Sequence, residues 1–301
     1  MSGETLNGLL KNGQKILEQS GIREAGLDAW LLLEYITGKS RAYYFAQGDE
    51  GVTEETACRY QELIRKRAEH IPLQHLTHQA FFMGYEFYVN EDVLVPRQDT
   101  ETLMEAALEL LKGNKAPRIL DMCTGSGCII TSLMLEVPEA SGTGVDLSEK
   151  ALEVAIRNAR ELGTADRTKF VKSDLFSAEY FSKKDNAEKV TGYDMLISNP
   201  PYIPSGEIEG LMEEVRLHDP RMALDGMEDG LYFYREITRQ AMDHIRPGGW
   251  LLYEIGCEQG KDVKELLEKE GFIKTEIRQD LCGLDRVVLG QRPLLQEEKY
   301  V

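Results

Sequence analysis

The stretch RILDMCTGSGCII, residues 118–130, combines a short apolar run, a loop with two glycines and the start of a second apolar run. Gly125 and Gly127 are separated by one residue and follow directly after the first run. Glycines at this spacing let the backbone pass close to a ligand and let a helix begin tightly. The stretch therefore predicts a strand over residues 118–122, a ligand-binding loop and a helix from Gly127. A simple strand-to-helix turn explains these two glycines equally well when they are taken alone.

Strand-like and helical patterns alternate from this stretch to Gly290. Repeated β-α units imply a mostly parallel sheet with helices on both faces. The last two strands are close enough in sequence to form an antiparallel hairpin at one end of the sheet. Further strands are predicted over residues 142–146, 169–172, 193–198, 250–255, 273–280 and 286–290, and helices over residues 100–112, 127–137, 148–163 and 231–245. The fold class is therefore α/β, with a seven-stranded sheet.

The region before the sheet has a different pattern. Apolar residues recur at helical spacing there, and Thr53 is a good N-cap because two acids follow it in the first helical turn. The aromatic run AFFMGYEFYV, residues 80–89, predicts a β-hairpin around Met83-Gly84. The expected division of the chain is a helical bundle over residues 1–75, a β-hairpin linker over 76–95, an α/β domain over 96–290 and a loose tail over 291–301.

The composition argues against some classes of function. The 301 residues carry 52 acidic and 35 basic side chains, which gives a net charge of −17. Such an excess argues against unspecific binding to nucleic acid, which needs clustered Lys and Arg. The five cysteines include no CxxC pair, so the sequence indicates neither a metal site nor a disulfide framework. No signal-peptide pattern and no bilayer-length apolar run occurs, so we expect a cytoplasmic protein without membrane attachment.

Polar residues follow the next two strands at the same edge of the predicted sheet. Asp146 lies 19 residues after Gly127, where an acid can accept hydrogen bonds from both ribose hydroxyls of an adenosine ligand. Its alternative role, capping the next helix, is filled better by Ser148. After the third strand, Asp174 can accept from an adenine amino group while Leu175 covers the ring, although such a stretch taken alone is more often a solvated loop. Together these loops predict a nucleoside pocket, for NAD or for S-adenosylmethionine.

The residue three positions after Gly127 helps to separate these two ligands. Pyrophosphate binding usually requires a third glycine there, so that the helix can pack closely. This chain has Ile130 at that position. The sequence therefore favours a ligand without phosphates.

The fourth strand runs into Asn199-Pro200-Pro201-Tyr202. Proline is disfavoured in a central strand, and two adjacent prolines end the strand abruptly and stiffen the loop. The Asn199 side chain and the Pro200 main-chain carbonyl are two acceptors at fixed spacing, which suits a planar NH₂ group that gives one hydrogen to each. Tyr202 offers a flat face for the substrate plane or for a nearby sulfonium. The loop therefore predicts the catalytic and substrate-binding residues Asn199, Pro200, Pro201 and Tyr202.

Rigid placement explains how such a loop would promote methyl transfer. A conjugated NH₂ nitrogen is a poor nucleophile because its lone pair is delocalised. Two hydrogen bonds accepted from this group raise the electron density on nitrogen and aim the lone pair at a methyl carbon. Placement alone can contribute roughly 7–11 kcal/mol. The sulfonium charge is lost in the reaction, so no strong base is needed before the transfer.

Several motifs resemble those of a known family. ISNPPYI resembles the signature of amino-group methyltransferases that use S-adenosylmethionine. PLQHLTHQAFF, VLVPRQDTETL, LDMCTGSGCI, DPRMALDGMEDGL and LDRVVLG resemble the release factor glutamine methyltransferase family over nearly the whole chain. The resemblance implies a class I methyltransferase (Rossmann-like) fold and a helical front domain that docks the substrate. It also implies methylation of the glutamine side chain in the Gly-Gly-Gln motif of class 1 peptide chain release factors, giving N5-methylglutamine.

The resemblance also carries over individual residues. It implies that Arg97, Thr100 and Glu101 border the methionine end of the cofactor. Gln98-Asp99 and Cys123 depart from the pattern of many relatives, which have proline before the acid and glycine in place of the cysteine. Arg221 and Asp225 lie in a matching stretch, although a salt-bridged turn also explains them. The cofactor-binding positions implied by the family are Cys123, Thr124, Gly125, Ser126, Gly127, Asp146, Leu175 and Asn199.

Two other functions use the same residues. A DNA or RNA adenine N6-methyltransferase would also present a planar NH₂ to this loop, but it is expected to bring a basic track. A fold kept only as a binding module would not require intact Asn199, Tyr202 and Asp146. We favour a monomeric enzyme that acts on a release factor as its protein partner and makes no direct contact with nucleic acid.

Overall fold

The computed structural model describes residues 4–182 and 192–294, which form two compact units. The helical unit consists of Met1–Gln79 together with Leu211–His218, and the α/β unit consists of Ala80–Gly210 together with Asp219–Val301. The division differs from the expected one, because the hairpin belongs to the α/β unit and a short later segment belongs to the helical unit. Among the described residues, no helix combines the length and the apolar character needed to cross a membrane.

The helical unit is held together by leucines that repeat at helical spacing. Leu9 of the first helix, Leu32 of the second and Ile64 of the fourth are each at most 1% exposed. The expected N-cap is present, since the Thr53 hydroxyl accepts a hydrogen bond from the Thr56 amide at 3.2 Å. The helices are α1 (Leu6–Gln19), α2 (Ala25–Thr37), α3 (Arg41–Gln47), α4 (Glu54–Ala68), α5 (Leu73–Thr77) and α9 (Glu213–His218).

A buried ion-pair cluster fixes α9 within the helical unit. The Arg67 guanidinium lies 2.7 Å from Asp28 and 2.8 Å from Glu214, and its third nitrogen donates to the Ile71 carbonyl at 3.1 Å. Asp28 and Arg67 are each 6% exposed. The α9 segment therefore belongs by its contacts to the helical unit, although it follows the Asn-Pro-Pro-Tyr loop in sequence.

The α/β unit contains the predicted seven-stranded sheet, which confirms the expected fold class. Its strand order is β5-β4-β3-β6-β7-β9-β8, and the strands are parallel except for β9, which is antiparallel to both of its neighbours. The order reverses at β3, because β4 lies on one side of it and β6 on the other. The strands are β3 (Arg118–Met122), β4 (Ser141–Asp146), β5 (Thr168–Lys172), β6 (Tyr193–Ser198), β7 (Ile245–Glu254), β8 (Ile273–Gln279) and β9 (Asp285–Gln291).

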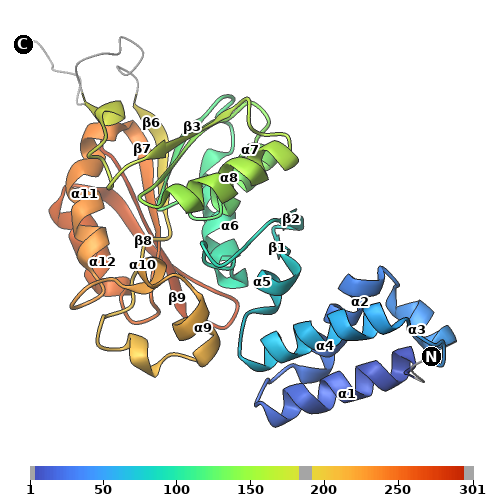
Figure 1. Cartoon of the computed structure of the whole chain (residues 1–301). Helices are drawn as coiled ribbons and strands as arrows, with labels where there is room; N and C mark the ends of the chain where they lie inside the picture. Colours follow the sequence, from blue (N-terminus) through green and yellow to red (C-terminus); the bar gives the residue numbers. More distant parts are fainter. Residues whose placement is uncertain (1–3, 183–191, 295–301) are drawn as a thin grey trace, which may run out of the picture. The chain divides into compact units, whose positions relative to one another are not determined.

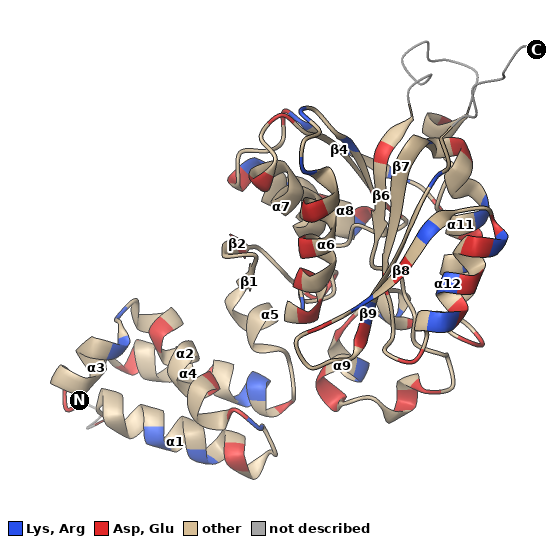
Figure 2. Ribbon diagram, turned by 180° about the vertical axis from the view of Figure 1, so that it is seen from behind, with Lys and Arg blue, Asp and Glu red and all other residues tan. Residues whose placement is uncertain are grey.

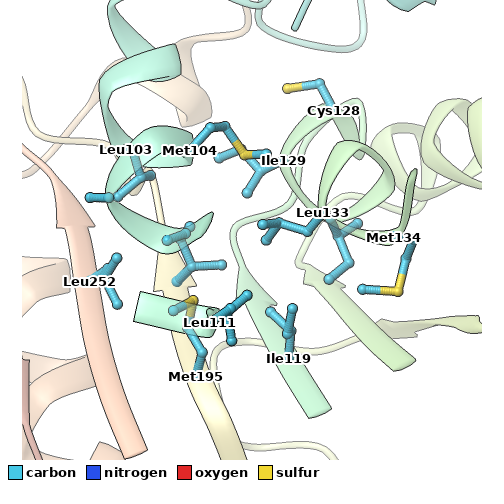
Figure 3. Packing of buried hydrophobic residues seen from close by; sticks show 14 of the residues in the cluster. Leu103, Met104, Leu111, Ile119, Cys128, Ile129, Leu133, Met134, Met195 and Leu252 are labelled. Atoms are coloured by element: carbon cyan, nitrogen blue, oxygen red, sulfur yellow. The ribbon is translucent and has the colours of Figure 1, made fainter. Parts of the chain in front are cut away.

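Helices cover both faces of this sheet, as the β-α alternation predicts (Figure 1). Successive residues of a strand point to opposite faces, so Ile119 joins the core under α6 and α7, and Leu120 joins the core under α11 and α12. Figure 3 shows Leu103 of α6 and Leu133 of α7 in the first of these cores. The helices are α6 (Glu101–Leu111), α7 (Cys128–Glu136), α8 (Glu149–Glu161), α10 (Arg221–Leu224), α11 (Tyr232–His244) and α12 (Gly260–Lys269), with short 3-10 turns η1 (Gln98–Thr100), η2 (Glu179–Phe181) and η4 (Ile208–Gly210).

The predicted hairpin is formed by β1 (Ala80–Phe82) and β2 (Tyr85–Phe87), which pair antiparallel. Met83 and Gly84 both have positive φ, 53° and 78°, which is the backbone geometry of a type I′ turn. Phe82 and Phe87 are buried in the core under α6 and α7. The hairpin is therefore part of the α/β unit, whereas a separate linker over residues 76–95 was expected from sequence.

Two boundaries near the end of the chain also differ from the prediction. Strand β7 begins at Ile245, five residues before the expected Trp250, and runs through Pro247. Its register against β6 shifts just before Trp250, so the N–H that Pro247 lacks is not needed for regular pairing. Gln291 belongs to β9, and residues 295–301 of the expected tail lie outside the described residues.

Candidate active site

A pocket of about 470 Å³ lies where strands β3, β4, β5 and β6 end, at the point where the strand order reverses. This volume suits a small molecule, and ligands of open α/β sheets bind at this position. The pocket brings together most of the residues predicted from sequence. Those that line it are Arg97, Thr100, Cys123, Thr124, Gly125, Ser126, Asp146, Asp174, Leu175, Asn199 and Pro201.

The loop after β3 has an unusual backbone. Cys123, Gly125 and Gly127 all have positive φ, at 63°, 53° and 75°. Gly127 does not line the pocket, because it lies against α8, where an added Cβ would be 2.9 Å from the Ala155 Cβ. Glycine adopts such φ values freely, whereas Cys123 is strained by them. The loop therefore turns sharply enough to present its backbone to the pocket.

Asp146 lies at the end of β4 and faces the pocket. Its two carboxylate oxygens accept backbone hydrogen bonds from Gly125 at 2.9 Å and from Ser148 at 2.8 Å. Ser148 caps α8, as predicted, by accepting from the Ala151 amide at 3.2 Å. Burial raises the pKa of Asp146, and these backbone hydrogen bonds oppose that rise. The carboxylate is thus held in place, and each oxygen retains capacity for a ligand hydroxyl.

Asn199 directly follows β6 and lies half-buried at the pocket wall. Its side-chain nitrogen lies 3.5 Å from the Thr100 hydroxyl. The preceding residue, Ser198, donates its hydroxyl to the Met122 carbonyl at 2.6 Å and so joins the ends of β6 and β3. Pro201 also lines the pocket, whereas Pro200 and Tyr202 do not.

Hydrogen bonds from a second segment brace the Asn-Pro-Pro-Tyr loop. Ile203 donates its amide to the Leu224 carbonyl at 3.0 Å and accepts at its own carbonyl from the Gly226 amide at 2.8 Å. The Gln259 side chain donates to the Tyr202 carbonyl at 2.9 Å. An added Cβ on Gly226 would lie 2.8 Å from the Tyr202 backbone, so the two segments need a glycine there. The loop is stiffened by this pairing as well as by its prolines.

Asp225 contributes to the same brace. Its carboxylate accepts from the Ser205 hydroxyl at 2.5 Å and from the Met227 amide at 3.0 Å. The hydrogen bond from Ser205 is the main cause that lowers the pKa of Asp225. Arg221 is exposed and lies 3.5 Å from Asp225. Both residues line the pocket, and Asp225 has in addition the structural role of the salt-bridged turn considered from sequence.

Two predicted residues, Glu101 and Tyr202, do not line the pocket, and a third, Arg97, lines it with its guanidinium already paired. The Glu101 carboxylate accepts from the Met83 amide at 2.8 Å and so holds the β1–β2 turn. Tyr202 packs against the core under α11 and α12, where burial raises the pKa of its hydroxyl. Arg97 lines the pocket, but its guanidinium is paired with Asp219 at 2.8 Å.

Two buried carboxyl groups at the same edge of the sheet were missed by the sequence analysis. Asp121 is 0% and Glu254 is 2% exposed, and one oxygen of each has no hydrogen-bond partner among the described residues. Burial raises the pKa of each group to about 7. In the sequence, each is a single acid within an apolar strand: Asp121 in ILDM and Glu254 in YEI. Burying a charge at such a position costs free energy, and this cost was the signal that could have identified both residues. Gln259 was also missed.

The sheet order and the position of the pocket define a class I methyltransferase. Two family models match the chain: a PrmC N-terminal domain over residues 8–77 and a methyltransferase domain over residues 114–271. The release factor glutamine methyltransferase of Clostridium acetobutylicum is 37% identical over 265 residues, covering 88% of this chain and 90% of its own. That of Cereibacter sphaeroides is 39% identical over 277 residues, covering 92% and 95%. The chain belongs to the release factor glutamine methyltransferase family.

A solved structure supports the fold independently. The human methyltransferase 10 domain containing protein aligns with a TM-score of 0.51 at 20% identity, covering 69% of this chain and 88% of that one. At this identity the likeness concerns the fold alone. It agrees with the seven-stranded sheet described above.

Proposed function

We propose that this protein transfers a methyl group from S-adenosylmethionine to the side-chain amide nitrogen of the glutamine in the Gly-Gly-Gln motif of class 1 release factors. The observation that carries the proposal is the position of Asn199, at the pocket wall on a loop held by Ile203, Gln259 and the prolines. Membership of the family supports the same reaction. We expect the enzyme to act as a monomer in the cytoplasm.

The residues of the pocket fit S-adenosylmethionine. Asp146 has acceptor capacity for two ribose hydroxyls, and Leu175 and Asp174 line the pocket next to it, where an adenine would need an apolar surface and an acceptor. Thr124, Gly125 and Ser126 line the pocket on the side of β3. When bound, the cofactor would supply an electrophilic methyl group on a sulfonium.

Asn199 and Pro200 would bind and orient the glutamine. The Asn199 side-chain oxygen and the Pro200 main-chain carbonyl would each accept one hydrogen of the amide NH₂. The nitrogen lone pair would then be directed at the methyl group, and the proton would leave after transfer. Holding two groups in this arrangement can contribute roughly 7–11 kcal/mol. A substrate without the NH₂ would leave both acceptors unsatisfied, at about 1–3 kcal/mol each.

The charge distribution supports a protein substrate over a nucleic acid. Acidic and basic residues are mixed on the outer helices α11 and α12, and the whole chain carries a charge of −17 (Figure 2). On α12 they form the pairs Lys264–Glu268 and Lys269–Glu265. A nucleic-acid adenine methyltransferase would be expected to carry a basic track instead.

Mass spectrometry of a purified release factor tests the proposal. After incubation with the enzyme and S-adenosylmethionine, the peptide that contains Gly-Gly-Gln should gain one methyl group on glutamine. Labelled cofactor offered with DNA or RNA should give no transfer. Asn199→Ala should abolish turnover and leave the dissociation constant of the cofactor within a few-fold. Methylation of nucleic acid, or no transfer to any substrate despite cofactor binding, would refute the assignment.

A further inference from the structure

Glu254 is a buried carboxyl group that the mechanism above does not use. It ends strand β7, which pairs with β6 and so lies beside the strand that leads to Asn199. Glu254 is 2% exposed, and its Oε2 has no hydrogen-bond partner among the described residues. The Thr100 hydroxyl and the Asn199 amide are nevertheless close enough to lower the pKa of this carboxyl by hydrogen bonding. An acceptor that is buried without a full partner, next to the proposed catalytic amide, calls for an explanation.

The chemistry of these three groups gives the hydrogen bonds a direction. An ionised carboxylate can only accept, so the Thr100 hydroxyl must donate its single hydrogen toward Glu254. The Thr100 oxygen is then free to accept from the Asn199 side-chain nitrogen, which lies 3.5 Å away. This arrangement leaves the Asn199 side-chain oxygen for the pocket. An amide rotated by 180° would instead place its oxygen against a hydroxyl that has no hydrogen left to give.

We propose that Glu254 is a positioning residue that, through Thr100, fixes the orientation of the Asn199 amide so that its oxygen faces the substrate. The 3.5 Å contact is long for a hydrogen bond, and such contacts in enzymes often shorten when substrate binds. The inference deepens the proposed function and rests on it for the identity of the substrate.

The orientation depends on pH, because a protonated Glu254 has a hydrogen of its own to donate. The direction of the three hydrogen bonds is then no longer fixed, and the rotated amide becomes acceptable. Burial raises the pKa of Glu254 to about 7, so both forms occur near neutral pH. The other charged or titratable groups that act on Glu254 are Arg286 of β9, Asp99 of η1, Tyr202, Tyr234 of α11 and Cys128 of α7. Methyl transfer should therefore rise as the pH increases through about 7.

Steady-state kinetics of Glu254→Gln between pH 5.5 and 9 test the inference. The substituted side chain has the same shape but both accepts and donates, so it cannot enforce one orientation. We expect kcat at pH 8 to fall about tenfold, with the cofactor dissociation constant unchanged within twofold and the rise through pH 7 removed. Thr100→Val should give the same loss, and the double variant should be no worse than either single variant. Glu270→Gln, at the exposed C-cap position of α12, is the matched control and should behave like the wild type.

Unchanged kcat and an unchanged pH profile in Glu254→Gln would overturn the inference. If this variant does not fold, the wild-type protein still provides a test by nuclear magnetic resonance. The Asn199 side-chain NH₂ signals can be identified by their absence in Asn199→Asp. We expect these signals to shift as the pH changes, with a midpoint near pH 7. Signals that do not change with pH would also overturn the inference. This measurement needs no release factor. Its outcome therefore stays separate from failure of the proposed function, which would appear as a wild-type enzyme that does not methylate release factor.

Discussion

In the helical unit the buried carboxylate of Asp28 lies 2.7 Å from the Arg67 guanidinium, whereas in the α/β unit Glu254 and Asp121 form no ion pair with any described residue. Burying a charge is costly unless it is paired. At Asp28 the helical unit meets this cost with a cation, whereas at Glu254 and Asp121 the α/β unit leaves one oxygen of each carboxyl without a partner among the described residues. The difference separates Asp28, whose pairing stabilises the helical unit, from Glu254, whose charge has no cation at hydrogen-bond distance and for which a positioning role is proposed above.

Asp146 represents a third arrangement. Its carboxylate is neither paired with a cation nor left without partners, because two backbone N–H groups donate to it. Such hydrogen bonds hold a charge without fixing a second side chain. The three carboxyl environments therefore make different predictions for substitution.

The largest effect is expected for Arg67→Met. Removal of the guanidinium leaves Asp28 and Glu214 without their cation, and breaking a buried pair on one side costs about 3–5 kcal/mol. Urea unfolding followed by Trp30 fluorescence measures this loss in the free energy of unfolding. The chain has two tryptophans, so a Trp250→Phe background leaves Trp30 as the single reporter. Arg65→Met, an exposed position on the same helix, is the control. A loss below about 1 kcal/mol would contradict the role given to the cluster.

Glu254→Gln is expected to stabilise the fold, and only at high pH. The pKa of Glu254 is about 7 in the folded state against 4.5 as the reference. Below 4.5 the carboxyl is protonated in both states; as the pH rises toward 7 it ionises more readily in the unfolded chain, so folding stability is lost. Thermal unfolding at pH 8 should show a gain for Glu254→Gln of at most about 3 kcal/mol, with none at pH 4. Equal effects at both pH values would show that the charge is not the cause.

Asp146→Ala is expected to weaken cofactor binding and to leave stability nearly unchanged. Loss of two hydrogen bonds to a charged acceptor should raise the dissociation constant of S-adenosylmethionine by about 10- to 100-fold. Isothermal calorimetry measures this change, with Glu153→Ala on the exposed face of α8 as the control. An unaltered dissociation constant would remove the ribose assignment.

The smallest effect is expected for Cys123→Gly. The φ of 63° at Cys123 is strained for an L-residue, and glycine relieves that strain while adding freedom to the unfolded chain. The two effects partly cancel, so the free energy of unfolding should rise by no more than about 1 kcal/mol. Differential scanning calorimetry would detect it, and a clear destabilisation would show that the thiol packs favourably in the loop.

The sheet and the loops at its edge could be predicted because their signals are local. Each strand is a short apolar run, and the residue types that serve a ligand follow it directly, as Asp146 follows β4 and Asn199 follows β6. The hairpin was recognised for the same reason, since Met83-Gly84 separates two aromatic runs. Periodicity and turn chemistry are readable within about ten residues.

The features that escaped prediction depend on residues far apart in sequence. The short polar helix α9 belongs to the helical unit because Glu214 meets Arg67, 147 positions earlier. Gln259 supports a loop carbonyl 57 positions away. Glu254 and Asp121 looked like ordinary acids within strands, and only their burial shows that they differ from surface carboxyls. No local pattern encodes such partners.

The membership of α9 has a consequence for dissecting the protein. The polypeptide passes from one unit to the other after residue 79, again after residue 210 and again after residue 218. The two units are therefore joined by three covalent connections rather than by one. A fragment that starts at Ala80 would keep α9 but lose Arg67, and would leave Glu214 without its cation. Removing the front of the chain therefore perturbs the segment that follows the Asn-Pro-Pro-Tyr loop, and loss of activity on truncation would not by itself measure substrate docking.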